Sequence, residues 1–164
     1  MVRRAFTLGL CVVVLVAFAA EGHLFAVDAN KAMYVGGTRT DIKEAAEGAF
    51  DVSSEAEMAF TPDKTKVRHT IAYKDVTELE YGQKAGRRVA VGLLVSPIAL
   101  FSKKRKHYLT INFKDAEAKD QAVVFELGKD IVRTAVKIVE TRSGKDVQFQ
   151  DDDARKSLGG GKGK

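Results

Sequence analysis

The side chains best suited to acid–base chemistry are two histidines and one pair of glutamates. His69 and His107 each fall in a stretch with the alternation of a β-strand, and no serine, cysteine or acid is spaced to complete a catalytic triad with either. Glu78 and Glu80 share one face of another such stretch, where paired carboxylates can exchange protons with a substrate. Alternation by itself already directs both toward solvent. The sequence therefore predicts a non-enzymatic protein with no catalytic residue.

Motifs for metal ions and phosphate are incomplete. Asp151–Asp153 places three carboxylates together but lacks the glycine and the distant glutamate of a calcium-binding EF-hand loop. Gly159–Lys164 is rich in glycine and lysine, yet no strand precedes it and no Lys-Ser or Lys-Thr follows, as a phosphate loop requires. We therefore expect no metal site, no cofactor and no small-molecule substrate.

The strongest chemical pattern is an apolar run with cations at both ends. Arg87–Arg88 precede the run, which covers residues 89–101, and Lys103–Lys106 follow it. As a helix the run would be roughly 20 Å long, shorter than the ~30 Å hydrocarbon core of a bilayer, and Pro97 would interrupt it. The run is therefore too short to span a membrane.

Two interpretations of this run remain open. In the first, residues 89–95 form a buried strand, Ser96-Pro97 makes a bend, and the cations are solvated; the protein then binds a protein partner through a sheet edge or a helix. In the second, the run protrudes, its apolar tip enters the acyl boundary of an anionic membrane, and each cation contributes about 1 kcal/mol at the headgroups. The second predicts a site for anionic lipid or an acidic protein partner made of Arg87, Arg88, Leu93, Leu94, Ile98, Leu100, Phe101, Lys103, Lys104, Arg105 and Lys106.

Both ends of the chain differ in composition from its middle. Residues 1–20 combine a basic start, an apolar stretch and the Ala-Phe-Ala pattern of a cleavable signal peptide, so we expect an exported protein, periplasmic or secreted, which could be peripheral to a membrane. The only cysteine, Cys11, leaves with that segment, which removes disulfides and thiol chemistry. Export and a net charge of only +5 argue against nucleic acid as a partner. Residues 150–164 are polar and glycine-rich and predict a flexible tail.

Between these ends the apolar pattern changes from period two to the period of a helix. A hairpin is expected around Ser53–Glu55, and the clearest strand alternates through Leu109, Ile111 and Phe113. From Lys129 onward apolar residues recur every three or four positions, which predicts an amphipathic helix with Asp130 as its N-cap or as an acid of its first turn, and with Gly144 at its end. Val147 and Phe149 are expected to add a short edge strand. The fold class is therefore α+β, with one domain over residues 31–149.

Six stretches follow one another in order along this part of the chain: Gly48–Val52, Glu57–Phe60, Ile71–Val76, Leu79–Gly82, His107–Ile111 and Val123–Leu127. Their succession, followed by the helix, resembles the bacterial pleckstrin-homology-like or GRAM-like domain family. The resemblance covers residues 31–149 and implies about seven antiparallel strands in a strongly bent sheet or partly open barrel, capped by one C-terminal amphipathic helix. It also implies a module that binds lipid, peptide or protein. In the lipid-binding members, cations in a loop between early strands hold the phosphates, whereas the early turns here are poor in cations.

Overall fold

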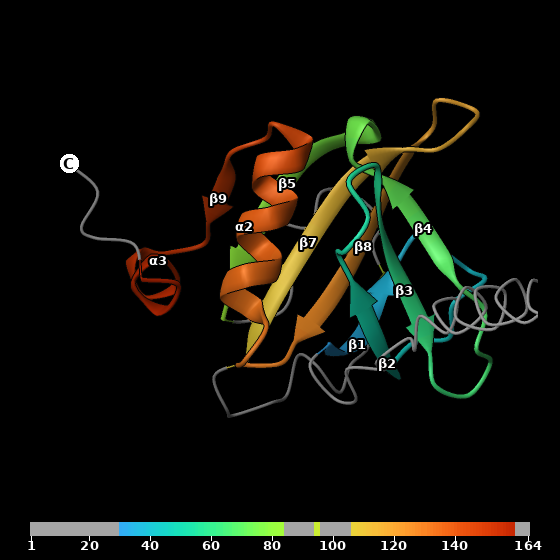
Figure 1. Ribbon diagram of the computed structural model, residues 1–164, viewed down its shortest axis with the longest axis horizontal. Helices are drawn as coiled ribbons and strands as arrows, with labels where there is room; N and C mark the ends of the chain where they lie inside the picture. Colours follow the sequence, from blue (N-terminus) through green and yellow to red (C-terminus); the bar gives the residue numbers. More distant parts are fainter. Residues whose placement is uncertain (1–29, 84–93, 96–105, 160–164) are drawn as a thin grey trace, which may run out of the picture.

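One strongly bent sheet and two short C-terminal helices make up the fold (Figure 1). The computed structural model describes residues 30–83, 94–95 and 106–159, with only the backbone of 94–95. Within this part the strands are β1 (Lys31–Gly37), β2 (Ala46–Asp51), β3 (Glu57–Pro62), β4 (His69–Ala72), β5 (Val76–Gly82), β6 (Leu94–Val95), β7 (His107–Lys114), β8 (Asp120–Leu127) and β9 (Val147–Phe149). A 3-10 turn, η1 (Tyr73–Asp75), joins β4 to β5.

The strands follow the order β4-β3-β2-β1-β8-β7-β5-β9, and β6 pairs with β1. Neighbouring strands are antiparallel except β9, which runs parallel to β5. The sheet curves into a half barrel, so β4 lies at one end of the strand order and β9 at the other. The α+β class, the bent sheet and the C-terminal helix are as predicted from the sequence, as are the hairpin between β2 and β3 and the short strand β9.

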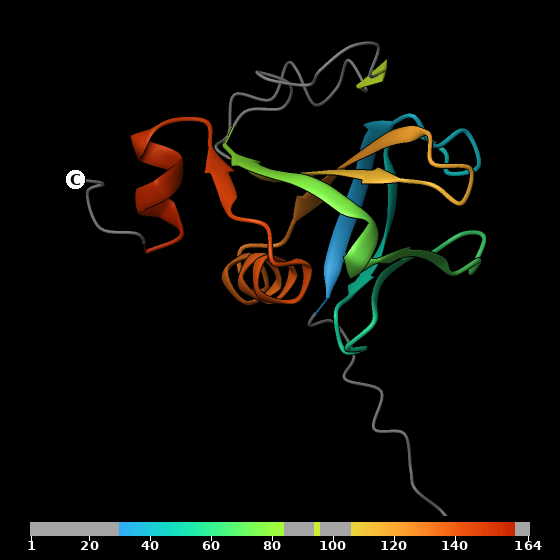
Figure 2. The same cartoon turned by 90° about the horizontal axis from the view of Figure 1, so that it is seen from above.

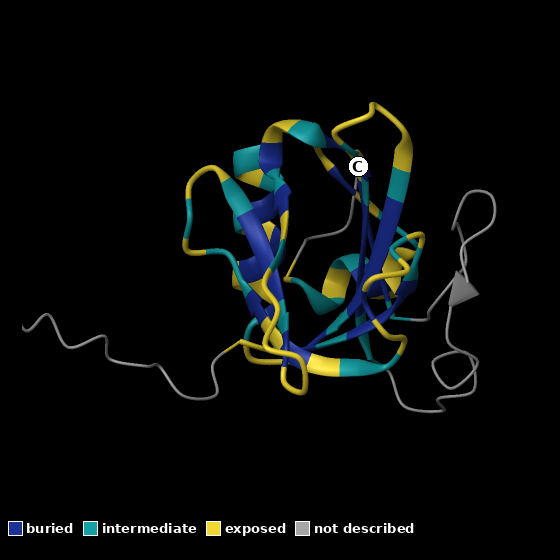
Figure 3. Ribbon diagram, turned by 90° about the vertical axis from the view of Figure 1, so that its right-hand side faces the viewer, coloured by how far each residue is buried: buried dark blue, intermediate teal, exposed yellow. Residues whose placement is uncertain are grey.

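The core fills the concave side of the sheet. Period-two alternation directs every second side chain of each strand to this side, and large apolar residues occupy those positions. Phe125 lies at the centre, with its ring centroid 5.0 Å from that of Phe50, 5.1 Å from Phe60 and 5.9 Å from Tyr34. Figure 3 shows the buried residues along the strands and the exposed residues in the connecting turns.

Helix α2 (Val132–Ser143) lies against the concave side of the sheet (Figure 2). Its apolar stripe, which includes Val132, Val136 and Val139, joins the core. Gly144 ends the helix with a φ of 66°, the left-handed conformation that glycine adopts without a Cβ penalty, as predicted. The predicted N-cap at Asp130 is wrong: the cap residue is Ile131, and the Gly128 carbonyl accepts the first helical N–H, so no side-chain cap is used.

A second helix, α3 (Asp152–Ser157), replaces most of the expected flexible tail. The Asp151 carboxylate accepts a hydrogen bond of 2.8 Å from the Ala154 N–H, which caps the helix. Ala154 is fully buried, and the Arg155 guanidinium lies 5.0 Å above the Phe149 ring. The prediction was wrong because composition counts the aspartates as solvated charges, whereas here they begin a helix that packs on β9. Residues 160–164 lie outside the described part.

Candidate functional site

Most of the predicted binding residues lie outside the described part of the chain. Lys106 is described with its side chain and Leu94 with its backbone; Arg87, Arg88, Leu93, Ile98, Leu100, Phe101, Lys103, Lys104 and Arg105 are not. Lys106 Nζ lies 2.8 Å from Glu126 Oε2, and Leu94 pairs with Gly37 in β1. Both described members of the predicted site are thus attached to the sheet.

The described residues bring a different set of polar side chains together, at the open end of the half barrel. Arg39 and Asp41 come from the loop between β1 and β2, and His69 is the first residue of β4. Arg39 holds Asp41 through two parallel hydrogen bonds, Nε to Oδ1 at 2.8 Å and Nη2 to Oδ2 at 2.5 Å. His69 Nδ1 lies 3.1 Å from the same Oδ2 and 3.4 Å from Arg39 Nη2. We call Arg39, Asp41 and His69 the open-end cluster.

The electrostatics of this cluster are dominated by its one carboxylate. The hydrogen bond from Arg39 lowers the pKa of Asp41 to about 2, and the same bond raises the pKa of Arg39. Beneath the loop, burial first and then the Asp41 charge raise the pKa of Tyr34 to about 12, and its hydroxyl donates to the Arg39 carbonyl at 3.1 Å. An ionised Asp41 therefore holds the loop and β4 together across the open end at ordinary pH.

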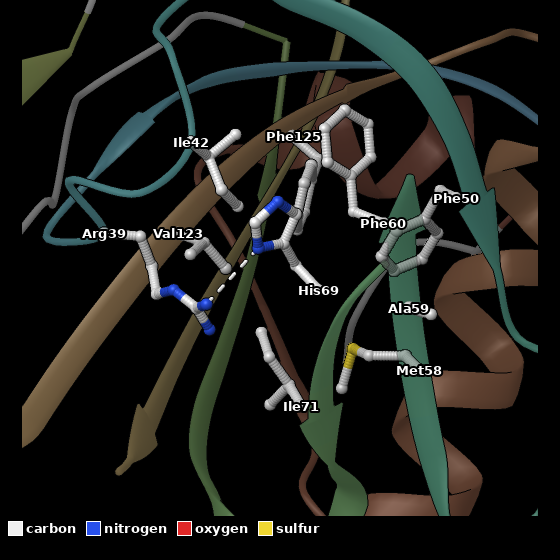
Figure 4. Close-up of a pocket in the computed structure, with 10 residues that line it drawn as sticks. All are labelled: Arg39, Ile42, Phe50, Met58, Ala59, Phe60, His69, Ile71, Val123 and Phe125. Atoms are coloured by element: carbon white, nitrogen blue, oxygen red, sulfur yellow. Dashed lines mark hydrogen bonds between the residues drawn. The ribbon is translucent and has the colours of Figure 1, made fainter. Parts of the chain in front are cut away.

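The apolar core lies directly beneath the open-end cluster (Figure 4). Arg39 and His69 border a cavity of about 10 Å³, room for roughly one water molecule, whose other walls are apolar side chains such as Phe60, Ile71 and Phe125. This cavity is too small for an organic ligand. A partner at this end must therefore bind across the surface and not within the barrel.

Two wider hollows flank the cluster. One, of about 280 Å³, lies toward the β7–β8 hairpin. The other, of about 500 Å³, lies beside β4 and is called the open-end hollow here; it is lined by Arg39, Asp41, Thr65, Val67, Arg68, His69 and Thr70. On one side of this hollow the Arg68 guanidinium forms ion pairs with Asp51 at 3.1 Å and with Glu57 at 3.4 Å. Val67, with 54% of its surface exposed, is the only large apolar side chain classed as exposed within the described residues.

The outer edge of β4 borders the open-end hollow. Tyr73 N–H donates to the Ala56 carbonyl, so the pairs Met58/Ile71 and Phe60/His69 carry the ladder hydrogen bonds at every second position. The backbone groups of Arg68 and Thr70 therefore point away from β3. No other described strand follows β4 in the sheet, and Thr70 is exposed. Among the described residues, this edge is a row of N–H and C=O groups that a partner strand could pair with.

His107, at the start of β7, belongs to a chain of hydrogen bonds that anchors α3. Ser157 Oγ is 2.7 Å from the Ala154 carbonyl, which only accepts, so Ser157 donates there. Tyr81 Oη, 2.8 Å from Ser157 Oγ, then donates to Ser157, and His107 Nδ1 donates to Tyr81 Oη across 2.5 Å. Burial first, and then the charges of Lys129 and Arg133, lower the pKa of His107, which favours the neutral ring. The hydrogen bond to Tyr81 Oη assigns its one proton to Nδ1. His107, Tyr81 and Ser157 are therefore all engaged in hydrogen bonds that hold α3 on the sheet.

The two glutamates of β5 have different surroundings. Glu78 is exposed and accepts a hydrogen bond of 3.3 Å from Asn112 Nδ2. Glu80 is only 6% exposed, so its predicted solvent-facing position is wrong. Thr110, opposite Glu80 on β7, is buried as well. The convex face of the sheet is therefore covered at this level, which alternation along one strand cannot reveal.

Comparison with known proteins finds no family model and no curated protein that matches this chain. Within residues 30–83 and 106–159, His, Cys, Asp and Glu side chains form no group of three or more suited to a metal ion. No helix in that same part of the chain has the length and apolar content needed to cross a bilayer.

Neither Arg39 nor Asp41 is predicted as a site residue from the sequence. The residues of the open-end cluster are separated by up to 30 positions and meet only because the sheet bends. The one local signal is an Arg and an Asp two residues apart in a loop that begins a polar segment. Such a pair is common on protein surfaces and does not by itself predict a site.

Proposed function

We propose that this protein is a non-enzymatic binding module that takes an extended polypeptide segment along the outer edge of β4. The observation that carries the proposal is the outward direction of the Arg68 and Thr70 backbone groups beside the open-end hollow. A bound strand would gain main-chain hydrogen bonds at this edge, and its alternate side chains would enter the hollow. Export and a pleckstrin-homology-like architecture, both inferred from sequence, would make it a scaffolding module at the cell envelope.

The charges near β4 do not select the sign of charge on the partner strand. The turn between β3 and β4 carries Lys64, Lys66 and Arg68 against Asp63. Of these, Lys66 pairs weakly with Asp63 at 3.4 Å, and both side chains are mostly exposed. Arg68 is already offset by Asp51 at 3.1 Å and by Glu57 at 3.4 Å. The charges around the edge therefore nearly balance, and main-chain hydrogen bonds, not net charge, would hold the partner strand.

A proline substitution on β4 tests this proposal. Thr70→Pro removes an N–H that points away from β3, so the sheet loses no ladder hydrogen bond and the protein is expected to fold. We would select binders from a displayed library of random seven-residue peptides and measure backbone amide shifts of the labelled protein. Selected peptides should shift the amides of Arg68 and Thr70 and bind at least tenfold more weakly to Thr70→Pro.

Ile71→Pro is the matched control, because the Ile71 N–H points toward Met58 and its loss should destabilise the sheet. Peptides that bind Thr70→Pro as tightly as the unchanged protein would reject the edge as the binding site. Selection of no peptide at all would count against the function itself.

The second candidate function is docking on an anionic membrane surface through residues 87–106. The cations on both sides of the apolar run favour it. Co-sedimentation of the full chain with liposomes tests it: this candidate predicts strong binding to vesicles that contain anionic lipid and weak binding to neutral ones. Equal and negligible binding to both would reject it.

A further inference from the structure

Helix α3 is too short to form by itself. It has six residues, whereas isolated helices shorter than about 12 residues are marginal in water. Ala154, which is fully buried, and Leu158, at the end of the helix, attach it to the core. Helix α3 is therefore expected only while it is docked beyond β9 (Figure 2).

Ser157, the last residue of α3, joins the helix to two other elements. Its Oγ accepts the Tyr81 hydroxyl of β5 at 2.8 Å. Its backbone carbonyl accepts a hydrogen bond of 3.3 Å from Arg133 Nη2 of α2. Undocking of α3 would break both contacts, so it would free the Tyr81 hydroxyl and the Arg133 guanidinium together.

The same two side chains lie next to His107. Tyr81 Oη accepts the Nδ1 proton of His107, and the two rings stack with their centroids 6.1 Å apart. Burial raises the pKa of Tyr81, so the phenol keeps its proton and remains a donor to Ser157. Arg133 is close enough to act on His107 through its charge. Docking of α3 thus fixes two neighbours of this histidine.

Charges from several elements determine which form of His107 is favoured. Burial first, then Lys129 before α2 and Arg133 on α2, lower the pKa of His107. Glu126 on β8 acts in the opposite direction. Its carboxylate is partly offset, because it forms an ion pair of 2.8 Å with Lys106. The docked structure therefore disfavours an imidazolium at this position.

We propose that His107 is a pH switch for α3, which undocks more readily when acid protonates this ring. Docking holds the Arg133 guanidinium beside the ring and the Tyr81 hydroxyl out of water, and undocking relieves both costs of a charged His107. The neutral ring carries no such cost, so α3 is held most firmly above the usual pKa of histidine, about 6.5. Below that pH the undocked form takes up the proton first, and docking weakens until both forms are protonated.

The switch is separate from the proposed binding edge. Strand β4 lies at one end of the strand order, whereas β5, β9 and the helix α3 that follows lie at the other. Binding along β4 and the pH response of α3 can therefore be tested independently.

Hydrogen exchange of backbone amides measures the docking. The Arg155 N–H donates to the Asp151 carbonyl within α3, so its protection factor, corrected for the intrinsic exchange rate at each pH, reports the docked fraction. Between pH 7.5 and pH 5.5 this factor should fall about threefold or more, while that of Val139, in the buried stripe of α2, should change less. No fall at Arg155, or an equal fall at Val139, would overturn the proposal.

His107→Asn is the matched control. The asparagine amide keeps an N–H donor close to the position of Nδ1 but does not titrate. In this variant α3 should stay docked, and the protection factor of Arg155 should be the same at both pH values. A pH dependence as large as that of the unchanged protein would assign the effect to another group and reject His107 as the switch.

Ser157→Ala gives a second readout in which His107 is retained. Loss of the Oγ acceptor should lower the protection factor of Arg155 at both pH values. Because coupling between docking and protonation is reciprocal, His107 should also titrate at higher pH in this variant than in the unchanged protein. NMR of the imidazole protons measures this midpoint, and the His107 resonance is assigned by its absence from His107→Asn. Unchanged protection would show that Ser157 does not hold α3, and an unchanged midpoint would show that docking and protonation are not coupled; either result rejects the switch.

Discussion

Phe125→Ala is expected to lower the free energy of unfolding by about 4 kcal/mol. The ring is 2% exposed and lies at the centre of the aromatic cluster formed with Tyr34, Phe50 and Phe60. Its removal loses the transfer free energy of the ring and leaves a cavity that strands of a bent sheet cannot close without breaking their ladders. Since a domain of this size is stable by only about 5–15 kcal/mol, the variant should be near its unfolding threshold at 25 °C.

Urea unfolding followed by circular dichroism measures the effect of Phe125→Ala as a shift of the transition midpoint at constant slope. Val67→Ala is the matched control because Val67 is exposed, and its change should stay within about 0.5 kcal/mol. A loss below about 1 kcal/mol for Phe125→Ala would contradict the packing described for the centre of the core.

Arg142→Met is expected to lower the free energy of unfolding by about 2–3 kcal/mol. Arg142, in the last turn of α2, donates from Nη1 to the carbonyls of Val52 and Ser54, the latter at 2.7 Å, and lies 5.6 Å above the Tyr73 ring. Hydrogen bonds from a charged donor are worth about 1.5–3 kcal/mol. Methionine retains the length of the apolar stem, so the loss would report the bonds that join the helix to the β2–β3 turn.

Thermal and urea unfolding of Arg142→Met and Lys137→Met provide the comparison on one helix. The Lys137 side chain is 75% exposed, and its ion pair with Glu140 should contribute no more than about 0.5 kcal/mol. If both variants lost the same stability, the contacts of Arg142 with the turn would have no special role in holding α2 on the sheet.

Local patterns were sufficient for much of the fold. The alternation through β7, the hairpin between β2 and β3, and the helix that ends at Gly144 could all be predicted from the sequence. Each depends on interactions between residues close together in the chain, where side-chain period and backbone preference act directly. The parallel pairing of β9 with β5 could not be predicted, because it joins segments more than sixty residues apart.

The candidate sites likewise divide into features that could be predicted from the sequence and features that only the folded structure reveals. Sequence alone identified the apolar run with its flanking cations, whose chemistry is a property of composition. It did not reveal the open-end cluster, the free edge of β4 or the buried convex face, because each of these exists only after the sheet has bent and its strands have been ordered. Residue type and spacing determined which strands and which helix form in this protein. The long-range closure of the sheet decided which side chains meet, which are covered and which edge stays open, since those depend on packing free energy summed over the whole domain.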